Sequence, residues 1–142
     1  MPDHGFGGAL AGSCVLVVED EFPIALQLES MLVDEGARVL GPYAEVTDAV
    51  ACATAADISA AILDVHVGRH SVDPIARILA RRQVPFLFYT GQGKDDPIYR
   101  EWPEVTSIMK PASDAALVDA LLVLLRRARP VRVARGALLR HL

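Results

Sequence analysis

Residues 14–21 read Cys-Val-Leu-Val-Val-Glu-Asp-Glu, a short apolar run that ends in three carboxylates. A second stretch of the same kind, residues 60–64, reads Ala-Ala-Ile-Leu-Asp. Short continuous apolar runs are typical of strands that are covered on both faces, as in parallel sheets. The two stretches therefore predict buried strands over Val15–Val18 and Ala60–Leu63, each followed directly by acidic side chains.

Further strands and helices alternate along the chain. The runs Phe86–Tyr89 and Val105–Met109 predict two more strands, and Arg38–Leu40 predicts a weaker fifth. Apolar residues recur at helical spacing in four segments between or after these strands, at Ile24–Leu32, Val46–Ala53, Ile75–Leu79 and Leu117–Leu125. Five such units predict an α/β fold, in which a parallel sheet lies between layers of helices with right-handed crossovers.

Capping residues agree with these helices. Pro23 and Pro74 suit a first helical turn, and Gly36 suits the end of the first helix. Asp73 and Ser113 are predicted to cap the third and the last helix.

The expected domain organisation is simple. Residues 1–13 are expected to form a flexible leader, 14–129 one folded domain, and 130–142 an extension with no output domain. The segment Gly93–Trp102 contains Pro97 and few apolar residues, so we expect a short, mobile helix or a loop there.

Composition indicates a cytoplasmic protein. No apolar stretch approaches the ~20 residues that span a bilayer, and the chain does not start with a basic leader. Cys14 and Cys52 are therefore expected to be small buried side chains and not a disulfide.

Charge is divided unevenly along the chain. Residues 1–125 carry −10, whereas residues 126–142 contain six arginines and no acid and carry +6. Such an end could contact nucleic acid, an acidic protein or a membrane surface. Its apolar residues, among them Val131 and Leu138, favour packing or an oligomer contact instead. Contact with nucleic acid or a membrane is thus not expected, and a homodimer stays open.

Polar side chains follow the ends of four predicted strands. They are Glu19 and Asp20, Asp64, Thr90 with Gly91, and Lys110. Each has an ordinary explanation taken alone, such as a helix cap, a turn or a solvated charge. Because the carboxyl ends of parallel strands meet at one edge of the sheet, we expect them to converge. Such a group suits Mg²⁺ or Mn²⁺, and it would let Asp64 attack a phosphoryl group while Lys110 and Thr90 contact the phosphoryl oxygens.

Four runs of residues resemble the signature of response regulator receiver domains of the CheY-like superfamily. They are Val17-Val18-Glu19-Asp20-Glu21, Ile62-Leu63-Asp64-Val65-His66-Val67-Gly68, Phe88-Tyr89-Thr90-Gly91 and Met109-Lys110-Pro111. The resemblance covers about Cys14 to Arg127. It implies a flavodoxin-like, doubly wound sheet of five strands in the order 2-1-3-4-5.

The same resemblance implies roles for single residues. Asp64 would be the phosphoacceptor and Asp20 a direct ligand of the metal, with Glu19 assisting through water. The backbone carbonyl of His66 would complete the protein's share of the coordination.

Two further residues would contact the phosphoryl group. Thr90 would be the hydroxyl switch and Lys110 the phosphate-contacting lysine. A cis peptide bond is expected before Pro111. The chain would accept its phosphoryl group from a sensor histidine kinase or phosphotransferase and would not be an enzyme beyond slow self-dephosphorylation.

The run Pro85–Gly93 resembles a subgroup with a Phe-Ala-Thr-Gly motif, known chiefly as single-domain regulators of alphaproteobacteria, which implies kinases of the HWE type. Ser107 stands where many receivers carry an aromatic switch residue. We expect Thr90 instead to pull the segment from Gly91 onward toward the phosphate, which would alter the surface near Tyr99 and Trp102. The last helix and the face around Gly93–Pro103 are the expected surface for a downstream protein.

Two alternatives are open from the sequence, and a third is excluded. A degenerate receiver would bind partners without phosphorylation, although the required residues are present. An aspartate-nucleophile phosphatase of the haloacid-dehalogenase kind would carry a second aspartate at position 66, where this chain has His66. A dinucleotide-binding loop built from Gly5, Gly7, Gly8 and Gly12 lacks its context, because these glycines precede the first strand.

Overall fold

A five-stranded parallel sheet forms the centre of the molecule. The computed structural model describes residues 7–91, 93 and 95–127. The sheet order is β2-β1-β3-β6-β7, with β1 Cys14–Val18, β2 Arg38–Tyr43, β3 Ala60–Leu63, β6 Phe86–Thr90 and β7 Ser107–Met109. All four neighbouring pairs are parallel. Counted along this sheet alone the order is 2-1-3-4-5, so the predicted fold class and strand order are confirmed.

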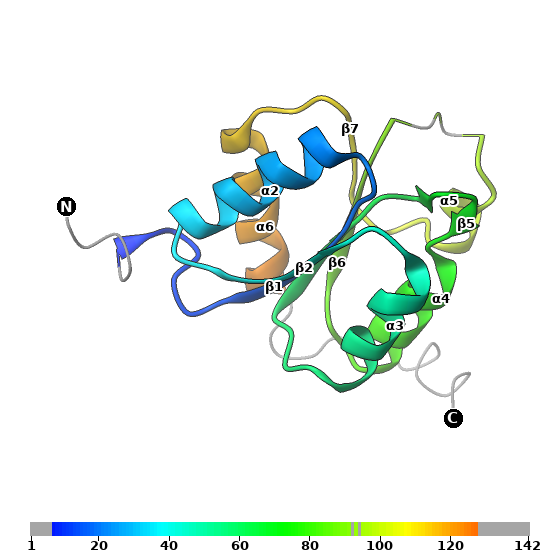
Figure 1. The fold of residues 1–142 in the computed structure, drawn as a ribbon, viewed down its shortest axis with the longest axis horizontal. Coiled ribbons are helices and arrows are strands. Elements are labelled where there is room, and N and C mark those ends of the chain that lie inside the picture. Colours follow the sequence, from blue (N-terminus) through cyan, green and yellow to red (C-terminus); the bar gives the residue numbers. More distant parts are fainter. Residues whose placement is uncertain (1–6, 92, 94, 128–142) are drawn as a thin grey trace.

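Helices cover both faces of the sheet. They are α2 Phe22–Asp34, α3 Val46–Ala55, α4 Asp73–Arg81, α5 Ile98–Glu101 and α6 Asp114–Arg127. Figure 1 shows α2 and α6 on one side and α3 and α4 on the other. Side chains of β1 alternate between the two core layers, since Val15 and Val17 pack with α2 and α6 while Leu16 and Val18 pack on the opposite side. Both faces of β1 are therefore buried, which explains its continuous apolar run.

Most predicted helix ends are confirmed. Pro23 and Pro74 lie in first turns, and the N–H of Ala116 donates to Ser113 Oγ at 3.1 Å. Gly36 has φ +88°, the left-handed conformation typical of a residue after a helix end.

The predicted cap at Asp73 is wrong. Asp73 is the first residue of α4 and follows Val72 at the N-cap position, where no side chain makes a capping bond. Its carboxylate instead accepts hydrogen bonds from Arg77 Nε and Trp102 Nε1, at 2.7 and 2.9 Å. A bond from a guanidinium is stronger than one from a neutral amide, so Arg77, one turn further on, draws this side chain away from the helix end.

Two features lie outside the predicted elements. After β3 the chain forms a small antiparallel hairpin of β4 His66–Val67 and β5 His70–Ser71. Before β1, Leu10 is 1% exposed within the core, and its N–H donates to the carbonyl of Glu35 at 2.9 Å. The packed domain therefore extends to the N-terminal side of the boundary predicted at residue 14. Residues 130–142, the expected extension, lie outside the described residues.

The segment Gly93–Trp102 contains the short helix α5, in line with one of its two expected forms. Among the described residues, no helix has both the length and the apolar character needed to cross a membrane.

Candidate functional site

Three carboxylates meet at the carboxyl ends of β1 and β3. Glu19 and Asp20 follow Val18, which pairs with Leu63, and Asp64 follows Leu63. Carboxylate oxygens of Glu19, Asp20 and Asp64 lie within 4.8 Å of one another. Glu19 and Asp64 are buried, whereas Asp20 is exposed. Like charges at this separation repel, so the cluster requires a cation nearby.

Lys110 supplies one positive charge from the end of β7. Its Nζ lies 2.9 Å from Asp64 Oδ2, 2.9 Å from Glu19 Oε1 and 2.7 Å from Glu21 Oε1. The backbone N–H of Lys110 donates to the carbonyl of Thr90 at 3.0 Å, which fixes the loop after β7 to the end of β6. The Lys110–Pro111 peptide bond is cis, as predicted. The lysine thus reaches the acids across the intervening strand β6.

Burial and hydrogen bonding shift the pKa of Glu19 and the pKa of Lys110 in opposing ways. Burial raises the pKa of Glu19 to about 7, although hydrogen bonds from Lys110 and from the N–H of Glu21 oppose the rise. Burial would lower the pKa of Lys110, but its hydrogen bonds to Glu21, Glu19 and Asp64 raise it above the usual value. The ammonium therefore stays charged at neutral pH, whereas Glu19 can take up a proton close to neutral pH.

These donors fit a hard divalent cation. Mg²⁺ and Mn²⁺ prefer oxygen ligands, and Mg²⁺ keeps several waters and takes one or two carboxylates from a protein. The cluster offers carboxylate oxygens alone, and exposed Asp20 gives a hydrated ion a side open to solvent. Asp20 Oδ2 also accepts the N–H of Gly68 at 2.8 Å, which fastens the turn of the β4–β5 hairpin beside the cluster.

Thr90 and Ser107 lie on the two strands beyond Asp64. Thr90 ends β6, the strand between β3 and β7, and is 1% exposed. Ser107 pairs with Phe88 and is half-buried, and Gly91 is exposed directly after Thr90. Strand order therefore places the threonine between the strand ends that carry Asp64 and Lys110.

Rings and one ion-pair network hold α5 against the sheet and α4. Tyr99 meets Phe88 edge-on with ring centroids 6.1 Å apart, and Trp102 meets Phe86 in the same way at 5.6 Å. Arg77 of α4 bridges to the carboxylates of Asp73 and Glu101, at 2.7 and 2.5 Å. The predicted switch residues Tyr99 and Trp102 thus contact β6, the strand that ends in Thr90.

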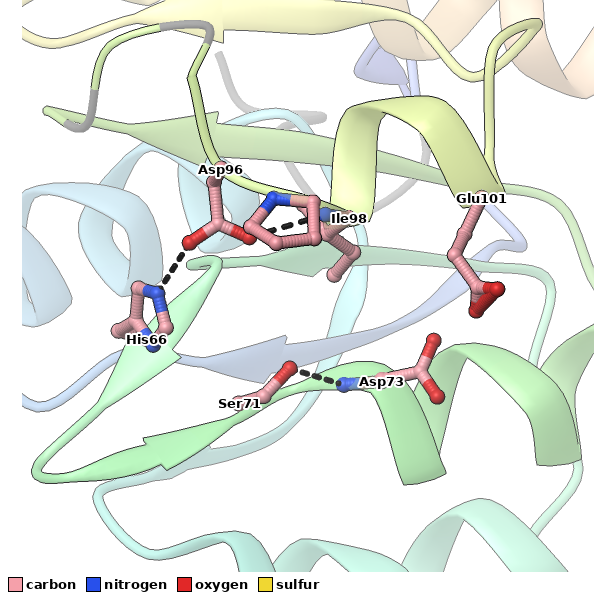
Figure 2. A pocket seen from close by; sticks show the side chains of 7 residues that line it. His66, Ser71, Asp73, Asp96, Ile98 and Glu101 are labelled. Atoms are coloured by element: carbon pink, nitrogen blue, oxygen red, sulfur yellow. Dashed lines mark hydrogen bonds and ion pairs between the residues drawn. The ribbon is translucent and has the colours of Figure 1, made fainter.

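A second contact joins the hairpin to the loop before α5. His66 Nε2 and Asp96 Oδ2 form a hydrogen bond, and both residues line a pocket of about 380 Å³; Figure 2 shows the two side chains facing each other. The pocket is lined by His66, Ser71, Asp73, Asp96, Pro97, Ile98 and Glu101. Asp96 Oδ1 accepts the N–H of Ile98 at 2.9 Å; burial would raise the pKa of Asp96, but the bonds with Ile98 and His66 lower it.

Sequence reasoning gave His66 only a main-chain role, so its side-chain contact with Asp96 was missed. The two residues are 30 positions apart, and no local pattern connects them.

No protein-family model matches the chain. It is 27% identical over 125 residues to the transcriptional regulatory protein PdtaR of Mycobacterium tuberculosis, a match that covers 86% of this chain and 61% of that protein. The chain thus spans less than two thirds of the curated relatives that it matches.

Solved structures share the fold. A response regulator receiver protein from Sinorhizobium medicae superposes with a TM-score of 0.74 at 22% identity, covering 85% of this chain and 100% of that one. The receiver domain of the sensor histidine kinase PA1611 from Pseudomonas aeruginosa, with a magnesium ion in its active site cleft, gives 0.72 at 23% identity over 82% and 99%. The chain therefore shares the fold of these receiver domains.

Proposed function

We propose that this chain is a phosphoacceptor response regulator of a two-component or phosphorelay system, phosphorylated on Asp64 with Mg²⁺. The observation that carries the proposal is the Lys110 ammonium 2.9 Å from Asp64, beside two further acids from another strand end. An acceptor carboxylate, oxygen ligands for a cation and a cation for the phosphoryl oxygens are the parts that this chemistry needs.

In the proposed transfer, an oxygen of Asp64 attacks the phosphorus of a phosphohistidine on a kinase or phosphotransferase. The new bond joins this oxygen to phosphorus, and the phosphorus–nitrogen bond breaks with its electron pair leaving on the imidazole. Lys110 then donates to one phosphoryl oxygen and the Thr90 hydroxyl to another. A magnesium ion, when bound, neutralises charge on the phosphoryl oxygens.

Asp20, Asp64 and the carbonyl of His66 are the proposed direct ligands of that ion, with Glu19 acting through water. The hairpin supports the use of the His66 carbonyl. The N–H of Val72 donates to the carbonyl of Val65, which marks residues 65 and 72 as a hydrogen-bonded pair. Hydrogen-bonded and non-hydrogen-bonded pairs alternate along antiparallel strands, so His66 and Ser71 form a non-hydrogen-bonded pair. In such a pair the backbone groups point away from the partner strand, so the carbonyl of His66 points out of the hairpin.

The output is proposed to be a surface change read by a protein partner. A phosphate can shift a loop only if it binds one conformation better than another, and the Thr90 hydroxyl gives Gly91 and the segment after it such a contact. The rings of Tyr99 and Trp102 contact phenylalanine rings of β6, and these contacts support a path from Thr90 to α5. We infer that the chain is a regulator and not itself an enzyme, and that it acts in the cytoplasm with a histidine kinase. Membership of the Phe-Ala-Thr-Gly subgroup would make that kinase one of the HWE type.

Intact-mass measurement tests the acceptor. Wild-type protein incubated with acetyl phosphate and Mg²⁺ should gain the mass of one phosphoryl group, and Asp64→Asn should not. Asp57→Asn is the matched control, because Asp57 is exposed at the opposite end of the strand that leads to Asp64. A gain that persists in Asp64→Asn rejects this acceptor, whereas no gain in wild type favours a degenerate receiver. Steady phosphate release from unrelated esters would favour a phosphatase.

A further inference from the structure

Glu21 contacts the site but has no part in the proposed transfer. Its Oε1 lies 2.7 Å from Lys110 Nζ, closer than the nearest oxygens of Glu19 and Asp64 at 2.9 Å. Its side chain is 60% exposed, whereas those of Glu19 and Asp64 are 1% and 8% exposed. The shortest of the three ion pairs is thus the one most open to solvent.

The number of donors on Lys110 limits what the ammonium can bind. A lysine ammonium has three N–H donors and no acceptor. In the structure three carboxylates accept from it, those of Glu19, Glu21 and Asp64. The donors of Lys110 are therefore all in use, and a phosphoryl oxygen that binds this ammonium competes with the three carboxylates.

Glu21 is the carboxylate that leaves at the lowest cost. Glu19 is buried, and its Oε2 also accepts the N–H of Glu21 at 3.0 Å. Asp64 is the proposed acceptor and stays beside the phosphoryl group that it carries. The carboxylate of Glu21 is 60% exposed and largely hydrated already, so its release exposes little new charge.

We propose that Glu21 is a competing ligand of Lys110, which occupies one ammonium donor until a phosphoryl oxygen displaces it. The inference rests on the proposed phosphoacceptor function and adds a residue that lowers the affinity of the site for phosphoryl groups. Glu21 also sets how readily an anionic donor reaches the ammonium, because its own carboxylate must move first.

Binding of beryllium trifluoride, which imitates a phosphoryl group on a carboxylate, tests this competition. Calorimetric titration with Mg²⁺ present should give about two- to fivefold tighter binding for Glu21→Ala than for wild type, because the carboxylate that is removed is largely exposed. The rate of phosphorylation by acetyl phosphate should rise by a similar factor. Glu21→Gln should lie between the two, since its amide oxygen still accepts a hydrogen bond without a charge.

Glu29→Gln is the control for charge. Glu29 lies about two turns after Glu21 on α2 and lines a pocket with Glu19 and Asp20, so this variant removes one negative charge near the site without removing a partner of Lys110. Its affinity should equal that of wild type, and the melting temperature of Glu21→Ala should stay close to wild type.

Either of two results overturns the inference: wild type binds the mimic and Glu21→Ala binds it no tighter, or Glu29→Gln tightens binding as much. A wild-type chain that takes up neither the mimic nor a phosphoryl group rejects the proposed function itself.

Discussion

The Lys110 corner, formed by Glu19, Asp64 and Lys110, and the short helix α5 lie along the same sheet but are held in different ways. The corner is buried, and its charged groups follow the ends of strands whose register is fixed by the sheet. Lys110 Nζ lies 2.9 Å from a carboxylate oxygen of Glu19 and 2.9 Å from one of Asp64. Helix α5 has four residues and is held by edge-on rings and by Arg77, whose side chain is 41% exposed. Regions with few buried contacts open at a lower free energy than core strands do. The acids and Lys110 thus lie at strand ends, whereas α5 is anchored by the buried Ile98 but exposes Arg100 and Glu101, so we expect it to open more readily than the strands.

Replacing the cationic side chain of each region should give the largest difference in stability between the two regions. Lys110→Met leaves two buried carboxylates without their cation, and removal of one partner of a buried pair costs about 3–5 kcal/mol. We expect a loss of that size in the free energy of unfolding from urea titration without metal, with Mg²⁺ restoring part of it. Arg77→Met, the control near α5, should cost less than about 1 kcal/mol because its ion pairs are exposed. Equal losses in the two variants would remove the contrast.

The pH dependence of the corner should be the next largest effect. Burial raises the pKa of Glu19 from 4.5 to about 7, so the folded chain holds this proton more tightly than the unfolded chain does. Its contribution to stability without metal is therefore complete below pH 4.5 and is lost as the pH rises through 7.

The affinity for metal depends on pH in the opposite direction to stability, because a cation needs the ionised carboxylate. Affinity for Mg²⁺, measured by calorimetry, should fall by up to about tenfold per pH unit below 7. Glu19→Gln should flatten this profile. An affinity of the wild type that is unchanged between pH 6 and pH 8 would contradict the assignment of the pH dependence to Glu19.

The smallest effect is expected at the contact between α5 and α4. Trp102→Phe keeps a ring beside Phe86 but removes the indole N–H that donates to Asp73, a loss of about 1 kcal/mol. Hydrogen exchange should quicken in residues 98–102 and stay unchanged in β1 and β3. Tyr99→Phe, which keeps both rings and the Asp73 bond, is the control. Faster exchange throughout the sheet would show that α5 is part of the global core.

The strand ends could be predicted because the information lies in adjacent residues. Apolar runs that stop before Glu19, Asp64 and Lys110 identify both the strands and the polar residues at their ends, and parallel topology then brings these ends together. Which acceptor takes which donor could not be predicted in this way. Glu21 and Lys110 are 89 positions apart, and their contact depends on rotamers and on the position of β7 two strands away from β3.

The missed features have other causes. The strands of the β4–β5 hairpin have two residues each, too few for any periodicity to appear. Leu10 is one apolar residue in a segment of small ones, so nothing local shows that it is buried. Asp73 has the residue type of a cap, but the competing partners Arg77 and Trp102 become visible only when α5 is folded against α4.

The indole that fixes α5 has one more consequence. Trp102 is the sole tryptophan in the sequence, and it lies between a phenylalanine ring and the carboxylate of Asp73. When tryptophan is excited selectively over the three tyrosines, the emission of the chain therefore originates at one point beside α5. A change in its emission when metal or phosphoryl donor is added would report motion there in the natural protein, with no label attached.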